Sequence, residues 1–168
     1  MNTARLGAYW PILAAAAAAF MLAAAHAFET FGHYPPCELC LKQRDVYWLI
    51  VWGGIGLAVV SRLKPPLLRF CCAVLAVLFL AECALAVYHA GVEWKWWAGP
   101  TACTSSGAHA ITAADMSALL TSKPQHIVQC DVAAWRLLGV SMAGWNALAA
   151  LALTLVSAVF AARKPAHV

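Results

Sequence analysis

The sequence predicts an all-α membrane protein, a bundle of four transmembrane helices. Two observations on composition support this: 64% of the 168 residues are apolar and only 11% are charged, with a mean hydropathy of +0.75. Soluble domains carry about 25% charged residues. The third observation is four apolar stretches near the roughly 20 residues that a helix needs to cross the bilayer. They run over about 9–28, 41–61, 67–88 and 137–162.

The first apolar stretch contains a run of alanines at 14–19, which is typical of a face that packs closely against another helix. Arg5, the alanine-rich core and Ala25-His26-Ala27 also imitate a cleavable signal peptide. The apolar core runs to about 18 residues, longer than the usual 7 to 15 of a signal peptide. We therefore expect an uncleaved first helix.

The basic residues at the helix ends predict the topology. Three short segments carry basic residues and no acidic ones: Arg5; Arg62, Lys64 and Arg69; Arg163 and Lys164. By the positive-inside rule these segments and both termini are cytoplasmic. The other two connections, about 29–40 and 89–136, include acidic residues and are expected outside. Because the net charge of +4 comes from helix ends, it does not indicate a nucleic-acid partner.

The cysteines divide between the outside connections and the third helix. Disulfides persist in oxidising compartments, so this placement supports a topology that was deduced from lysine and arginine alone. Four cysteines allow three pairings, and the Cys-x-x-Cys spacing used by redox pairs favours Cys37 with Cys40 and Cys103 with Cys130. The remaining three, expected to be structural, are Cys71, Cys72 and Cys83.

The segment before the second apolar stretch predicts a reactive thiol. Pro35 and Pro36 stiffen the approach, and the helix is expected to begin near Cys37 or Cys40. A cysteine in the first turn of a helix has its thiolate stabilised by the helix dipole. Arg44 follows Cys40 at i+4 on the same face. The alternative for Arg44 is an interfacial cation that only snorkels towards the headgroups.

The second outside connection begins with an aromatic belt of Trp94, Trp96 and Trp97. A turn-like Gly99-Pro100 stretch follows, and then a possible capping box that begins at Thr112. The apolar spacing of Met116, Leu119 and Leu120 predicts a short amphipathic helix on the membrane surface, which Pro124 ends. Cys103 and Cys130 would then flank a tethered, movable loop.

The order of these motifs resembles the disulfide bond formation protein B (DsbB) family of bacterial inner-membrane oxidases. The resemblance covers nearly the whole chain, which we expect to form a single domain over 1–168. It is carried by Pro36-Cys37-Glu-Leu-Cys40 with Gln43-Arg44, Gly99-Pro100-x-x-Cys103-Thr, Cys130-Asp131 and Trp135-Arg136-x-x-Gly139. Four hydrophobic spans together with these motifs make the pattern specific.

The resemblance implies a mechanism and partners. Cys103 would form a mixed disulfide with a periplasmic DsbA-like protein of the thioredoxin fold, and Cys130 would exchange with Cys37. Cys40 would face a membrane quinone, either ubiquinone or menaquinone. Arg44 and, less closely matched, His89 would bind that quinone, with no metal required. The implied location is the bacterial inner membrane, with the redox cysteines in the periplasm.

Other functions remain open at this stage. Cys37, Cys40, Cys103 and Cys130 could form a four-thiolate zinc site, although the second pair lacks Cys-x-x-Cys spacing. The Cys103–Cys130 disulfide could be purely structural, and a vitamin K epoxide reductase-like thiol oxidoreductase is the nearest alternative enzyme. Glu82, an ionisable residue inside a span, is either part of a proton route with His89 or a neutral, packed carboxyl.

Overall fold

The computed structural model describes residues 3–100 and 130–163. It contains four long helices: α1 (Thr3–Thr30), α2 (Glu38–Leu63), α3 (Leu68–Glu93) and α5 (Met142–Ala162). All four are long and apolar enough to cross a membrane, which confirms the predicted fold class. A 3₁₀ turn, η1 (Pro65–Leu67), joins α2 to α3. Cys103 and the amphipathic helix predicted near 112–120 lie outside the described residues.

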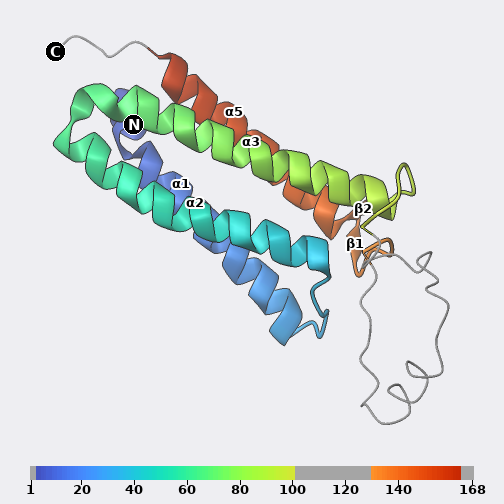
Figure 1. The fold of residues 1–168 in the computed structure, drawn as a ribbon. Helices are drawn as coiled ribbons and strands as arrows, with labels where there is room; N and C mark the ends of the chain where they lie inside the picture. Colours follow the sequence, from blue (N-terminus) through green and yellow to red (C-terminus); the bar gives the residue numbers. More distant parts are fainter. Residues whose placement is uncertain (1–2, 101–129, 164–168) are drawn as a thin grey trace, which may run out of the picture.

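The helices run side by side as one elongated bundle, in which α1 packs on α2 and α3 packs on α5 (Figure 1). The start of α1, the α2–α3 connection and the end of α5 share one end of the bundle. The end of α1, the start of α2 and the end of α3 meet at the other. This second end also holds a two-stranded hairpin, β1 (Arg136–Leu137) with β2 (Val140–Ser141).

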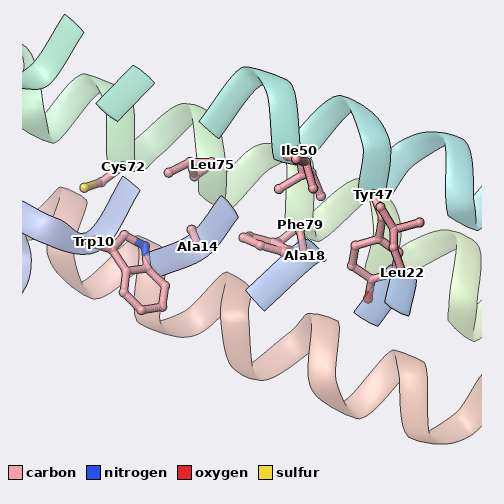
Figure 2. Packing of buried hydrophobic residues seen from close by; sticks show 10 residues of the cluster. Trp10, Ala14, Ala18, Leu22, Tyr47, Ile50, Cys72, Leu75 and Phe79 are labelled. Atoms are coloured by element: carbon pink, nitrogen blue, oxygen red, sulfur yellow. The ribbon is translucent and has the colours of Figure 1, made fainter. Parts of the chain in front are cut away.

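Small residues let α1 and α2 approach closely, as the alanine run predicted. Ala14 and Ala18 are fully buried, and Cβ atoms added at Gly54 would lie only 3.0 Å from the Cβ of Ala15. The larger core side chains fill the space between α1, α2 and α3 (Figure 2). Cys72, from α3, is part of this core and has no exposed surface.

The last membrane helix begins at Met142, five residues later than the apolar pattern around 137 suggested. Arg136 pairs with Ser141 across a tight turn, in which Leu138 and Gly139 have φ values of 52° and 81°. Two successive residues with positive φ are typical of a two-residue hairpin turn. Ser141 then caps α5 by accepting a hydrogen bond from the Gly144 N–H at 3.2 Å. The chain therefore turns back before it becomes helical.

Candidate functional site

The Cys-x-x-Cys pair sits at the start of α2, as the sequence predicted. Cys37 is the N-cap residue, and its sulfur accepts a hydrogen bond from the backbone N–H of Cys40 at 3.4 Å. Cys40 lies in the first turn, where helix N–H groups are directed towards its surroundings. The two sulfur atoms lie 3.1 Å apart, with the Cys37 thiol donating to Cys40. A donated hydrogen bond favours negative charge on the accepting sulfur, which is that of Cys40.

Cys37 is the thiol of the pair that is buried and holds its proton more firmly. Its hydrogen bond to Cys40 and its burial both raise the pKa of the Cys37 thiol well above its ordinary value. Only 5% of the residue is exposed. At neutral pH Cys37 therefore keeps its proton in the reduced pair.

Cys130 packs directly into the cluster that contains Cys37. Leu39 from α2 and Val92 from α3 complete this buried group, and Cys130 is only 1% exposed. The next residue, Asp131, forms an ion pair of 2.6 Å with Lys95 in the turn after α3. This ion pair ties the segment that carries Cys130 to the end of α3. The structure thus brings together three of the four predicted redox cysteines; the fourth, Cys103, lies outside the described residues.

His89 lies against the cysteine pair from the side of α3. Its Nε2 atom is 3.6 Å from the Cys37 sulfur and 3.8 Å from a carboxylate oxygen of Glu93. Its Nδ1 atom is 3.1 Å from the side-chain nitrogen of Gln43. The imidazole is 4% exposed. His89 is therefore next to the thiols and not merely near the outer end of its helix.

Arg44 is held by α1. Its Nη1 atom contacts the carboxylate of Glu29 at 2.5 Å, and its Nη2 atom donates to the backbone oxygen of Ala25 at 3.2 Å. The sequence placed Arg44 one turn after Cys40, but it did not reveal the partnership with Glu29. That contact spans the turn between two helices, so no helical spacing could predict it.

A cavity of about 400 Å³ opens beside the pair, between α1, α2, α5 and the segment around the hairpin. Most of its lining is apolar, including Leu22, Phe28 and Trp135. The lining also includes polar side chains: Cys37, Cys40, Gln43, Arg44, Tyr47, His89, Glu93 and Asn146. An apolar pocket with a few convergent polar groups is typical of a site for a small organic molecule. A flat, apolar ring with carbonyl oxygens, as in a quinone, fits this lining.

Sequence reasoning missed four of these polar side chains as site residues: Gln43, Tyr47, Glu93 and Asn146. Gln43, Tyr47 and Asn146 lie in the predicted apolar spans, and a polar residue within a membrane helix is itself a signal of function. These three are connected by hydrogen bonds of 2.6 and 2.9 Å. Applied to every polar residue of the spans, and not to Glu82 alone, that rule would have found them. Glu93 follows the predicted third span, so the rule would not have found it.

The same cluster contains possible metal ligands. The sulfur atoms of Cys37 and Cys40 and one imidazole nitrogen of His89 lie within 4.8 Å of one another. Two thiolates and an imidazole are ligands that Zn²⁺ accepts. The geometry alone therefore fits either a redox pair or a metal site.

The comparison with protein families bears on this choice. The family model described as Disulfide bond formation protein DsbB matches residues 7–160. The chain belongs to the DsbB family. A protein described as uncharacterized, from Rickettsia prowazekii (strain Madrid E), is 26% identical to it over 130 residues, which cover 76% of this chain and 72% of that protein. No solved structure gives a significant match.

Membership of the DsbB family gives the clustered thiols a general role. The chain is a thiol oxidoreductase of disulfide bond formation, and a multi-pass membrane protein. Quinones are involved in the family in general. The cysteine pair at the mouth of an apolar cavity is in accord with that chemistry.

Proposed function

We propose that this protein oxidises the dithiol of a periplasmic DsbA-like protein and passes the electrons to a membrane quinone. The observation that carries the proposal is the position of the Cys37–Cys40 pair. It contacts Cys130 through the buried cluster, and it opens onto the apolar cavity. Thiol exchange needs direct contact between sulfur atoms, whereas the quinone is confined to lipid. A cysteine pair that lies beside both Cys130 and the cavity can connect thiol exchange with quinone reduction.

The first half of the reaction is disulfide exchange. The partner's thiolate attacks a Cys103–Cys130 disulfide at Cys103, and the partner's second thiol then closes its own disulfide, so Cys103 and Cys130 become thiols. The thiolate of Cys130 attacks Cys37 in the oxidised Cys37–Cys40 pair, and Cys40 leaves as a thiolate. Cys103 resolves the bond between Cys130 and Cys37. Two electrons and two protons have then moved from the partner to the Cys37–Cys40 pair.

The second half returns the Cys37–Cys40 pair to its disulfide. The bound quinone supplies a two-electron, two-proton acceptor. Arg44, whose guanidinium stays charged, lines the cavity together with Cys40. Its N–H groups would stabilise negative charge on Cys40 and on an oxygen of the ligand. His89 supports Cys37 from the opposite helix.

The proposal includes an orientation and a location. The end of the bundle that holds the cysteines faces the periplasm, and both termini are cytoplasmic, as the positive-inside rule predicts. The membrane is the bacterial inner membrane. The acceptor is ubiquinone, with menaquinone as the substitute in its absence.

The partner reaction is tested by trapping. In Cys130→Ser, Cys103 is an unpaired thiol, so its thiolate can attack the disulfide of an oxidised DsbA-like protein and release one thiol of that partner. The mixed disulfide at Cys103 should accumulate, because Cys130, which would otherwise displace the partner, is missing, and mass mapping should identify it. Cys37→Ser, which keeps Cys103 and Cys130, is the matched control and should not accumulate this mixed disulfide. A Cys103→Ser variant that still oxidised the partner at the normal rate would contradict the assigned order.

A metal-binding function is the second candidate, because Cys37, Cys40 and His89 are spaced for a metal ion. Metal analysis of the protein, purified without chelators, distinguishes the two. Under our proposal the purified protein holds far less than one zinc or copper ion per chain and still oxidises its partner. Equimolar metal that abolishes oxidation when bound would favour the second candidate.

A further inference from the structure

A partly buried hydrogen-bond chain joins three helices next to the cysteine pair. The Tyr47 hydroxyl donates to Asn146 Oδ1 at 2.6 Å. The side-chain nitrogen of Asn146, from α5, donates to Gln43 Oε1 at 2.9 Å and to Glu82 Oε1 at 2.8 Å. Every hydrogen-bonding group of the Asn146 amide has a partner, so the amide is fixed in one orientation. Glu82 is fully buried, and its Oε2 has no partner among the described residues.

The orientation of Asn146 determines the state of His89. Because the Gln43 oxygen accepts from Asn146, the Gln43 nitrogen faces His89 Nδ1, 3.1 Å away. An amide nitrogen can only donate, so Nδ1 must be the acceptor. A neutral imidazole then carries its hydrogen on Nε2, the atom 3.6 Å from the Cys37 sulfur.

We propose that Asn146 is a positioning residue that, through Gln43, holds His89 with its hydrogen on Nε2, the ring nitrogen beside the Cys37 sulfur. The inference rests on the proposed function, in which Cys37 must give up its proton when the pair closes to a disulfide. Negative charge then develops on the Cys37 sulfur, and a fixed N–H donor stabilises it.

The loss of Asn146 would release this arrangement. The Gln43 amide could then rotate and present its oxygen to His89 Nδ1. The ring would carry its hydrogen on Nδ1, and Nε2 would become an acceptor facing Cys37. An acceptor there opposes negative charge on the sulfur, so the oxidation step slows although the thiols stay in place.

The test is the tautomer of His89 in the full-length protein in lipid nanodiscs. Nitrogen-15 histidine labelling reports which ring nitrogen carries hydrogen, and the signal missing from His89→Asn identifies the residue. We expect Nε2–H in the wild type and a mixture of tautomers in Asn146→Leu. Gln43→Met provides a second variant should Asn146→Leu fail to fold. Thr154→Val is the control, because among residues 3–100 and 130–163 the Thr154 hydroxyl bonds only to the Ala150 oxygen, within α5.

Kinetics complete the test. Oxidation of the reduced Cys37–Cys40 pair by a short-chain ubiquinone, at saturation, should slow about tenfold in Asn146→Leu and Gln43→Met, the effect of losing one hydrogen bond to a charged group. The double variant should be no slower, because both residues act through His89. An unchanged tautomer in both single variants would overturn the inference. A wild type that holds Nε2–H but never reduces quinone would instead overturn the proposed function and leave the positioning intact.

Discussion

Single residues at the site differ in how far the sequence predicted them. The cysteines were recognised by their spacing, and the prolines before them predicted a helix start near Cys37 or Cys40. Helix α2 begins at Glu38, with Cys37 as its N-cap. Glu29, by contrast, meets Arg44 across an interhelical turn. Asn146 meets Gln43 from a span more than a hundred residues away. Contacts of this kind depend on how the helices pack, which local spacing does not encode.

Arg44 gives the residue-scale prediction. Arg44→Ala should raise the quinone KM or lower turnover about ten- to a hundredfold, since a charge-assisted hydrogen bond is worth roughly 1.5 to 3 kcal/mol. Arg44→Lys should recover part of the loss, because it keeps the charge without the fork of donors. Quinone titrations of the purified variants measure both effects.

Glu29→Gln is the matched variant for the partner of Arg44. It keeps a side-chain oxygen for Arg44, which also retains its bond to the Ala25 oxygen, so its effect should be smaller than that of Arg44→Ala. Disulfide exchange between Cys103 and the partner should stay near normal in all of these variants. Unchanged quinone kinetics in Arg44→Ala would contradict a role in quinone binding and would show that Arg44 is only an interfacial cation.

At the scale of the elements, apolar length predicted the four helices well, because a span across lipid must satisfy its backbone internally. The pattern failed where the fourth helix starts. Residues 137–140 are apolar enough to extend a span, yet Leu138 and Gly139 adopt positive φ and close a hairpin. Hydropathy does not distinguish an apolar turn at the membrane edge from the first turn of a helix.

The contact between α1 and α2 gives the element-scale prediction. Gly54→Leu should destabilise the bundle by about 1 to 3 kcal/mol, the usual cost of overpacking, since even a Cβ there meets Ala15 at 3.0 Å. Gly53→Leu is the control, because a Cβ at Gly53 meets nothing within 4 Å. Thermal unfolding in detergent compares the two. Equal melting temperatures would contradict the close packing at Gly54.

At the scale of the whole molecule, the bundle has two unlike ends, one with Cys37, Cys40 and Cys130 and one with Arg62, Lys64 and Arg69. The proposed orientation predicts the outcome of labelling in intact spheroplasts. After reduction, Cys103 should react with a membrane-impermeant maleimide, whereas a cysteine introduced at Lys64 should react only after lysis. Cys130, which is buried, does not report on the orientation. Protection of Cys103 together with labelling at position 64 would reverse the orientation.

The account's central claim is that the Cys37–Cys40 pair delivers its electrons to a quinone in the adjoining cavity. The direct measurement mixes the purified, reduced protein with oxidised ubiquinone, without a partner protein, and follows quinone absorbance and thiol mass together. The account predicts one quinol for each disulfide formed in the protein, that of Cys37–Cys40 and, by exchange, that of Cys103–Cys130, with no quinol from Cys40→Ser. Formation of these disulfides without quinol, or quinol at an undiminished rate from Cys40→Ser, would contradict it.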